Sequence, residues 1–397
     1  MTSIDPSTAR AALGLATLWL LLAARTSFAF SMLAHQEIVD RAWEKQIEPL
    51  LERRFPGGTP DELKEARSYA YGGAVVADLG YFPFGDEFFS ELIHYVRTGD
   101  FAESLLVSAH DRNGYAFALG HLAHYAADGV GHPRATNRAV AELFPKLAAE
   151  HGPSVTYADS ASAHLQTEFR FDVLEVARLG FRHERFQDAI GFHLDRDVLA
   201  DAVRRTYDLE LEDLFDNVDL ALGTFRFGVR TFLREVTNVG WHLYESDLKK
   251  QTPDLTFAEY SFDMPLEEFE KSFGTLYREP SYFARFVGAL TALVHLIPGV
   301  RWFEREVFRP LPDGVIRLFA EGVDGASDRY RELLAQAARP HPAFPNVDLD
   351  TGQSTSRGEY ALADEAYAEW LYRLAKKHYD GVTADQRREL LRFYRDL

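Results

Sequence analysis

The chain of 397 residues contains no cysteine. Disulfide bonds, cysteine-ligated zinc sites and thiol nucleophiles are therefore excluded together. Positive charge is also in short supply, because the formal net charge is −18 at pH 7. Such a protein does not attract nucleic acid by charge alone, and we expect no stable nucleic-acid partner.

Strand-type alternation of apolar and polar residues is scarce, and no internal repeat stands out. Hydrophobic residues make up 46 % of the chain, which is typical of a globular protein with a real core. Apolar residues recur instead at helical spacing, in segments that include 35–54, 60–71, 190–222, 224–248, 361–377 and 383–397. Thr383 and Gln386 predict a capping box at the start of the last helix. We therefore predict an all-α fold, with a long loop bearing proline and aspartate at 339–358.

Residues 11–24 form an apolar run of fourteen residues near the amino terminus. This length is short for a membrane span and typical of the core of a signal peptide. Ser27 and Ala29 place small residues at the −3 and −1 positions of a cleavage site. We predict cleavage after Ala29, a mature chain that begins at Phe30, and secretion or a periplasmic location. An uncleaved amino-terminal membrane anchor is the alternative.

A second apolar run, residues 283–298, contains Arg285 and His295. It is too short to span a bilayer, so we expect a core helix there. The alternative is an interfacial helix, which would give the protein a peripheral contact with a membrane.

The segment richest in metal-ligating side chains is 120–133. His124, Asp128 and His132 are spaced four apart, so on a helix they lie on one face, which His121 shares. Imidazole nitrogens and carboxylate oxygens are ligands that zinc accepts. This segment is therefore a candidate metal site.

Further candidate ligands lie elsewhere in the first half, where eight of the fourteen histidines precede residue 170. His164 and Glu168 again stand four apart, on one face of a predicted helix. Asp78 lies in an apolar, glycine-punctuated stretch, where a buried carboxylate without a partner costs on the order of several kcal/mol. We expect Asp78 to cap a helix or to bind a cation. His35 and His94 complete the set.

The candidates together exceed the needs of one zinc ion, which takes three or four ligands. They suit two or three ions that share carboxylates. Clustered cations clamp phosphoryl oxygens and lower the pKa of a bound water, so the inventory favours phosphoester chemistry. For each residue alone, the alternative is a solvated helical pair or an ordinary core or surface histidine. The set consists of His35, Asp78, His94, His124, Asp128, His132, His164 and Glu168.

The motifs around these residues resemble the zinc-dependent phospholipase C family, which is related to the S1/P1-type single-strand nucleases. They read FSMLAH at 30–35, GAVVADLGYFP at 73–83, IHYV at 93–96, LGHLAHYAADGVGHP at 119–133 and HLQTEF at 164–169. Their order agrees with the family at every motif, and so does their internal spacing except for the step from Asp128 to His132. The resemblance covers about residues 30–175.

The resemblance implies an all-helical domain that holds three zinc ions. The first ion would be held by Asp78, His94, His124 and Asp128. The second ion would be held by His132, His164 and Glu168. The third ion would be held by the terminal amine and carbonyl of Phe30, with His35 and Asp128. That amine exists only after cleavage behind Ala29, which gives the processing a chemical purpose.

The sequence departs from the family pattern at two points. Phe30 stands where tryptophan is usual, although a residue that ligates through its backbone need not be tryptophan. The step of four residues from Asp128 to His132 is shorter than in the best-known secreted members and resembles many bacterial ones. We expect Gly129 and Gly131 to break the helix here, so that His132 turns aside to the second ion.

The sequence thus predicts a zinc-dependent phosphoesterase of phospholipase C type, in which a zinc-activated water hydrolyses phospholipid phosphodiesters. Asp78 is the predicted catalytic residue, because it would orient or deprotonate that water.

His121 lies outside the family's ligand set, and we expect it either to donate to a ligating carboxylate or substrate phosphate, or to be an ordinary core histidine. The alternatives in function are an S1/P1-like nuclease and a non-catalytic zinc-binding surface protein. The expected organisation is a signal peptide at 1–29, a catalytic domain at 30–180 and a C-terminal helical extension of unknown role at 181–397.

The intact mass of the exported protein tests the predicted processing. We expect a mass that corresponds to a chain beginning at Phe30, because only that terminus supplies the amine ligand. A chain that begins at any other residue would contradict both the cleavage site and the third zinc site.

Overall fold

The computed structural model describes residues 30–82, 84–177, 193–261 and 310–395. The predicted signal peptide and the apolar run 283–298 lie outside these residues. Across the described ranges the chain is helical, and the β-type pairing found there is an isolated antiparallel bridge between Val347 and Ser354. The predicted all-α class is confirmed. None of the described helices is long and apolar enough to cross a membrane.

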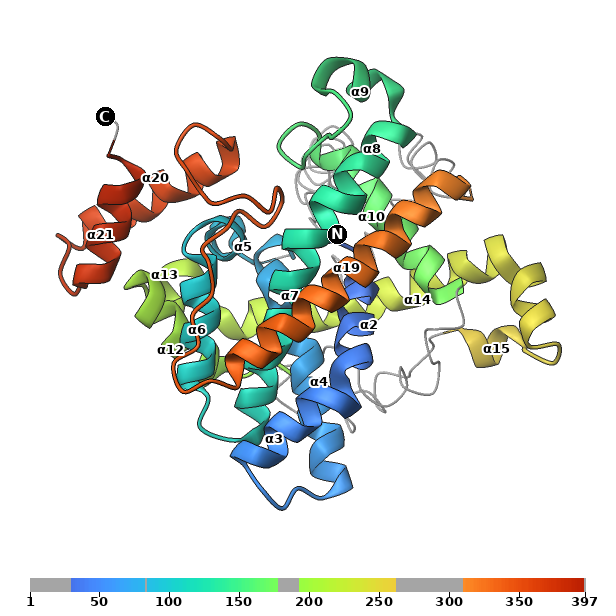
Figure 1. Cartoon of the computed structure of the whole chain (residues 1–397), viewed down its shortest axis with the longest axis horizontal. Helices are drawn as coiled ribbons and strands as arrows, with labels where there is room; N and C mark the ends of the chain where they lie inside the picture. The colour runs from blue at the N-terminus through green and yellow to red at the C-terminus, as the bar shows by residue number, and fades with distance from the viewer. Residues whose placement is uncertain (1–29, 83, 178–192, 262–309, 396–397) are drawn as a thin grey trace, which may run out of the picture.

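The described helices follow one another along the chain, with no sheet between them in the described ranges (Figure 1). The first part contains α2 (Met32–Ala42), η1 (Trp43–Ile47), α3 (Glu48–Arg54), α4 (Pro60–Val75), η2 (Val76–Tyr81), α5 (Glu87–Tyr95), α6 (Thr98–Ser108), α7 (Arg112–Gly131), η3 (His132–Thr136), α8 (Asn137–Leu143), α9 (Pro145–His151) and α10 (Ala161–Ala177). The second part contains α12 (Arg196–Tyr207), α13 (Leu211–Leu214), α14 (Val218–Gln251), α15 (Phe257–Tyr260), α19 (Asp313–Ala337), α20 (Ala361–Lys376) and α21 (Ala384–Phe393). The segments η1 and η3 are single π-helical turns, whereas η2 is a 3₁₀ helix.

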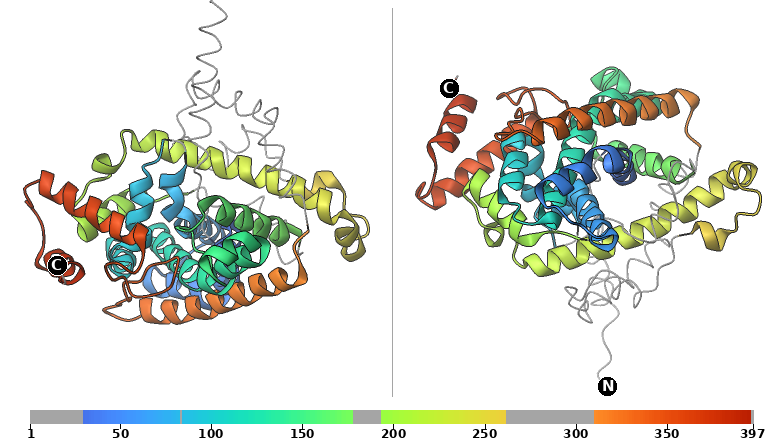
Figure 2. Two further views of the ribbon diagram at one scale, coloured as in Figure 1. Left: turned by 90° about the horizontal axis from the view of Figure 1, so that it is seen from above. Right: turned by 60° about the horizontal axis from the view of Figure 1, so that its bottom comes forward.

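The central element is α7, whose residues from Gly114 to Asp128 are buried on all sides. A helix that is buried all round has to be covered by neighbours in every direction. The helices α4, α6, α2 and α19 pack against it, and α19 crosses it in Figure 1. Figure 2 shows α14 and α19 on opposite sides of this bundle. Residues 120–128 therefore lie in the interior of this bundle.

The crossing of α4 and α7 is unusually close. A Cβ atom at Gly120 would overlap the carbonyl oxygen of Ala70, and a Cβ at Gly73 would overlap the carbonyl oxygen of Phe117. These glycines let the two backbones touch. This explains why α4 continues to Val75, whereas the sequence predicted that the helix would end near Tyr71.

The C-terminal segments share the same hydrophobic core as residues 30–177. The ring of Phe319 on α19 lies 4.5 Å from that of Phe171 on α10. The Tyr330 hydroxyl donates to the carbonyl of Leu119 on α7 at 2.9 Å. The helix α20 packs against α5. The division of the chain at residue 180 stays a prediction.

The expected helix over 190–222 is wrong in its extent, because its described part consists of α12, α13 and the start of α14. Asp208 ends α12 in a left-handed conformation with φ of 56°, which aspartate adopts more readily than most residues. Asn217 then caps α14 by accepting from the amide of Leu220 at 3.0 Å. The helices expected at 361–377 and 383–397 correspond to α20 and α21. The capping box of Thr383 and Gln386 is confirmed.

Two alanine substitutions on α7 test the close crossing. Gly120→Ala should lower the free energy of unfolding by about 3 kcal/mol, because a backbone carbonyl rather than a flexible side chain has to move. Gly129→Ala is the matched control, since its Cβ would meet only the Leu349 side chain at 3.6 Å. We expect the control to be neutral or more stable by about 0.5–1 kcal/mol, because glycine is a poor helix former. Urea unfolding followed by circular dichroism measures both, and equal stability of the two variants would contradict the packing described.

Candidate metal centre

The carboxylate of Asp128 lies at the centre of a buried histidine cluster. Its Oδ1 atom lies 3.0 Å from Nε2 of His35 and 3.7 Å from Nε2 of His132. Its Oδ2 atom lies 3.1 Å from Nε2 of His124 and 3.3 Å from Nε2 of His94. The two oxygens therefore face different groups, as in a carboxylate that bridges two cations.

One group lies on the Oδ2 side of Asp128 and adds Asp78 from η2. The carboxylate of Asp78, His94 from α5 and His124 from α7 place their ligating atoms within 4.8 Å of one another. The two Nε2 atoms of His94 and His124 are only 3.1 Å apart, and Asp78 Oδ1 lies 3.6 Å from His94 Nε2. Two ring nitrogens that face each other so closely need a proton or a cation between them.

A second group lies on the Oδ1 side and includes the amino-terminal segment. The backbone nitrogen of Phe30 lies 3.2 Å from Asp128 Oδ1, beside His35 from α2. Asp172 anchors this segment, because its Oδ1 accepts from the Ser31 hydroxyl at 2.7 Å and from the Leu33 amide at 2.8 Å. The nitrogen of Phe30 therefore lies beside His35 and Asp128, and its role as a ligand stays a prediction.

The third group joins η3 to α10. His164 Nδ1 lies 3.0 Å from Oε1 of Glu168, and His132 Nε2 lies 3.4 Å from the same oxygen. The expected break at Gly129 and Gly131 is not present, since α7 runs to Gly131 and continues directly into the π-helical turn η3. A Cβ at Gly131 would instead overlap the ring of Phe30.

The outer nitrogens of three histidines are held by backbone carbonyl groups. A carbonyl oxygen can only accept, so each Nδ1 carries the hydrogen and leaves Nε2 for the centre. The pairs are His35 Nδ1 with Ser31 O at 2.8 Å, His94 Nδ1 with Ser90 O at 2.7 Å and His124 Nδ1 with Ala74 O at 3.1 Å.

Several inward-facing atoms of the three groups make no hydrogen bond with the described residues. Each buried polar atom left in this state costs about 1–3 kcal/mol, and charged atoms cost more. Imidazole nitrogens and carboxylate oxygens with this convergence are what zinc ligands require, so the residues present suit the metal. The atoms are Asp78 Oδ1, Asp128 Oδ2, His132 Nε2, His164 Nδ1 and both carboxylate oxygens of Glu168.

The surroundings of the two central carboxylates shift their pKa values in opposite directions. Burial raises the pKa of Asp78, although His124 and His94 act against this rise. Burial acts in the same direction on Asp128, but the charges of His124 and His132 outweigh it and hold the pKa of Asp128 well below its ordinary value. Two neighbouring carboxylates with opposite pKa shifts are suited to different chemical roles.

His121 is buried beside the cluster. Its ring lies 6.0 Å from that of His124 and edge-on to Phe101 at 5.1 Å, and its Nδ1 makes no hydrogen bond with the described residues. Burial, followed by the charges of His124 and His94, holds the pKa of His121 well below its ordinary value, so its ring is neutral. Its role as a donor or as a core residue stays a prediction.

Sequence reasoning missed Asp350, which lies in the loop expected at 339–358. Its Oδ1 atom lies 3.0 Å from Nδ1 of His132 and 3.5 Å from Nε2 of His164. Burial raises the pKa of Asp350, but the hydrogen bond with His132 and the two histidine charges outweigh it and lower the pKa. No spacing signal links residue 350 to the motifs that end at 169, so only the composition of the loop pointed to it.

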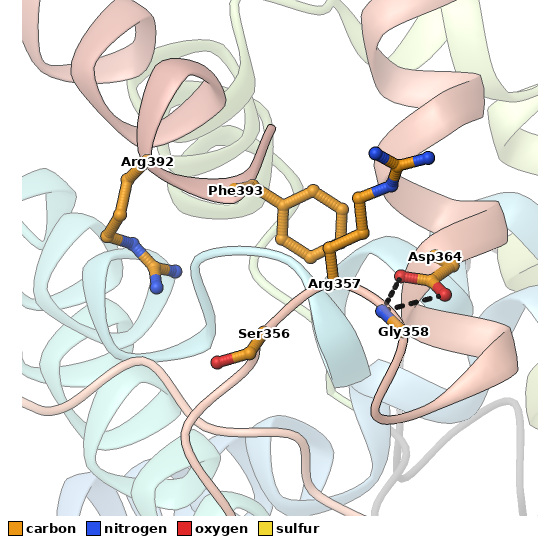
Figure 3. Close-up of a pocket in the computed structure, with 6 residues that line it drawn as sticks. All are labelled: Ser356, Arg357, Gly358, Asp364, Arg392 and Phe393. Atoms are coloured by element: carbon orange, nitrogen blue, oxygen red, sulfur yellow. Dashed lines mark hydrogen bonds between the residues drawn. The ribbon is translucent and has the colours of Figure 1, made fainter. Parts of the chain in front are cut away.

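A polar pocket of about 420 Å³ lies in the C-terminal part of the protein, and none of its lining residues belongs to the histidine cluster. Figure 3 shows the guanidinium groups of Arg357 and Arg392 on opposite sides of the Phe393 ring, so they do not converge on one anion. Arg392 is also paired with Glu389 at 2.6 Å. The pocket is lined by Ser356, Arg357, Gly358, Asp364, Arg392 and Phe393.

Comparison with known proteins agrees with the chemistry of the cluster. The family model described as zinc dependent phospholipase C matches residues 34–217, somewhat less than half of the chain. No curated protein and no solved structure matches the chain. The matched residues include every side chain predicted as a ligand, from His35 to Glu168, whereas Asp350 lies beyond them. The predicted resemblance to the zinc-dependent phospholipase C family is confirmed over residues 34–217, which match the family model.

Proposed function

We propose that the protein is a zinc-dependent phosphodiesterase that hydrolyses phospholipids in the manner of a phospholipase C. The family is one of hydrolases that act on phosphoester bonds. The observation that carries the proposal is the convergence of buried carboxylate and imidazole atoms that make no hydrogen bond. A buried cluster with only a structural role would have paired these atoms with one another or replaced them with apolar groups.

Three zinc ions account for the grouping of the ligands. Asp78, His94, His124 and Asp128 would hold the first ion. His132, His164 and Glu168 would hold the second ion. The amine and carbonyl of Phe30, His35 and Asp128 would hold the third ion. The division of the two Asp128 oxygens between His94 and His124 on one side and His35 and Phe30 on the other supports a bridging role for this carboxylate.

When bound, zinc lowers the pKa of water and neutralises charge on phosphoryl oxygens. Asp78 is the catalytic residue in this proposal. Its buried carboxylate faces His94 and His124, where it orients the attacking water and accepts its proton. Attack of the water oxygen forms a new P–O bond while the bond from phosphorus to the leaving oxygen breaks. The proton that Asp78 accepted then neutralises the departing alkoxide.

Phospholipid is the proposed substrate because the net charge of −18 disfavours a polyanionic strand more than a zwitterionic head group. The family supports this substrate class. A nuclease of the S1/P1 type is the second candidate, since the ligand set alone does not distinguish the two.

We further propose that the protein is exported and cleaved after Ala29, since the position of the Phe30 nitrogen beside Asp128 supports a terminal amine ligand. Its contact with the membrane would then be peripheral.

Zinc content and stability test the metal sites. The purified protein should contain two to three zinc ions per chain, and fewer than two would contradict the mechanism. Zinc added back to chelated protein at about a thousand times its Kd should raise the free energy of unfolding by about 4 kcal/mol per site, because it binds only the folded ligand set. Glu168→Gln should lose one ion, whereas the exposed Glu150→Gln should retain all of them.

Hydrolysis assays with Asp78→Asn test the catalytic role. The amide cannot accept a proton, so we expect kcat on phosphatidylcholine micelles to fall by roughly 10²- to 10⁴-fold. Asp61→Asn, in the exposed first turn of α4, is the control and should keep full activity. A zinc-loaded Asp78→Asn variant with normal activity would remove Asp78 from the mechanism. Inactivity on lipid together with rapid cleavage of single-stranded DNA would favour the nuclease.

A further inference from the structure

The loop between α19 and α20, residues 338–360, is attached to the helices that carry the proposed ligands. It runs beside α6 in Figure 1. The Val347 amide donates to the Thr98 hydroxyl at 3.0 Å, and that hydroxyl donates to the Val347 carbonyl at 2.8 Å. The Leu349 amide donates to the backbone carbonyl of His94 at 3.1 Å. The loop is thus fixed against α5 and α6.

The turn at 348–352 presents Asp350 to the interior. The amide of Asp350 donates to Oδ1 of Asp348 at 2.8 Å, and its carbonyl accepts from Nδ2 of Asn137 at 2.9 Å. Gly352 has a φ of 70° and lies against the carbonyl of Gly129 at the end of α7, where a side chain would collide. Both the backbone and the side chain of Asp350 are therefore held in one place.

The two carboxylate oxygens of Asp350 have separate partners. Oδ2 accepts from the amide of Tyr157 at 2.9 Å and from the hydroxyl of Tyr360. The Tyr360 oxygen in turn accepts from the Ala158 amide at 3.3 Å, so its hydrogen is free for Asp350. Oδ1 is left for the histidines, at 3.0 Å from His132 Nδ1.

This arrangement determines which nitrogen of His132 faces the metal side. A carboxylate oxygen can only accept, so His132 Nδ1 carries a hydrogen. Its Nε2 then points with a free lone pair towards Glu168 Oε1 at 3.4 Å and Asp128 Oδ1 at 3.7 Å. Nε2 is among the buried atoms that make no hydrogen bond with the described residues.

His164 is oriented through Asn137 by the same loop. The Nδ2 group of Asn137 donates to the Asp350 carbonyl, which fixes its Oδ1 as the acceptor for His164 Nε2 at 2.8 Å. His164 Nδ1 is therefore the nitrogen with the free lone pair, and it faces Glu168 Oε1 at 3.0 Å. The two histidines present opposite ring nitrogens to one carboxylate, each because of Asp350.

We infer that Asp350 is a positioning residue for the second zinc site, and that the C-terminal loop completes a site whose ligands come from the first half of the chain. The inference rests on the proposed function, because it assumes zinc between His132, His164 and Glu168. A carboxylate behind a ligating imidazole fixes the ring and its tautomer and makes the metal-facing nitrogen a stronger ligand. The ligating atoms of Asp350, His132 and His164 lie within 4.8 Å of one another, so their distances alone also admit Asp350 as a ligand. The ring nitrogens that Asp350 reaches face away from Glu168, and this favours a positioning role.

The variant Asp350→Asn tests this inference, because it reverses the direction of the hydrogen bond at His132 Nδ1. The donors Tyr157 and Tyr360 both require an acceptor, so the amide oxygen of the new side chain has to take the place of Oδ2. Its NH₂ group then faces His132 Nδ1, and this nitrogen has to accept a hydrogen bond from it. That requirement places the hydrogen of a neutral imidazole on Nε2, the atom that should bind zinc.

Zinc titration of the full-length mature protein against a competing chelator measures the effect. We expect one zinc ion to bind 10- to 100-fold more weakly in Asp350→Asn, with the other ions unchanged. Tyr360→Phe keeps the carboxylate but removes one of its donors, and it should weaken the same ion to a smaller extent. Asp364→Asn is the matched control. Asp364 lies on α20, accepts from the Gly358 amide of the same loop at 3.0 Å, and has no hydrogen bond or ion pair with a histidine among the described residues. Its zinc affinities should equal those of the unmodified protein.

Nitrogen-15 spectra of the histidine rings provide a readout that general loosening of the fold would not change. The zinc-loaded protein should show a protonated Nδ1 for His132, and Asp350→Asn should lose that signal while the signals of His35 and His94 persist. Unchanged zinc affinities and ring signals in Asp350→Asn would overturn the inference and leave the proposed function standing. A protein that binds zinc with this dependence on Asp350, yet hydrolyses no phosphodiester, would instead remove the proposed function. Retention of an ion by Glu168→Gln but not by Asp350→Asn would make Asp350 a ligand and overturn the positioning role.

Discussion

The burial of one carboxylate constrains the whole bundle. Asp128 is buried on α7, where water cannot solvate its charge, and an uncompensated carboxylate in such a place is very costly. Imidazoles from α2, α5, α7 and η3 approach it from both sides. Each ring reaches the carboxylate only where its helix is accurately placed, so the packing of the bundle and the charge at its centre depend on each other.

The orientation of the imidazoles has two physical origins. The outer nitrogens of His35 and His94 each donate to the carbonyl group of the residue four positions earlier in the chain. This is a local property of the backbone. His132 follows α7 in a π-helical turn, and its outer nitrogen is held by Asp350, 218 residues further along the chain. The histidine cluster is therefore only partly built by its motif, and the distant loop holds one of its rings.

Close contact between backbones makes room for this arrangement. The glycines at the crossing of α4 and α7 bring the helices together, and Gly131 leaves space for the Phe30 ring beside η3. Phe30 also contacts Phe171 and Phe319, so the start of the described chain, α10 and α19 meet around one aromatic side chain. The C-terminal helices thus support the site through packing, although the proposed ligands precede them.

The sequence by itself determined the helical class, the spacing of four that places His124 next to Asp128 and His164 next to Glu168, and the family motifs. Such features are local, because the helical repeat alone decides which residues share a face. Only the tertiary structure decided that α4 passes through Gly72 and Gly73, that the two Asp128 oxygens face different histidines, and that Asp350 lies behind His132. These depend on where distant segments of the chain pack against one another, and neither periodicity nor motif spacing carries that information.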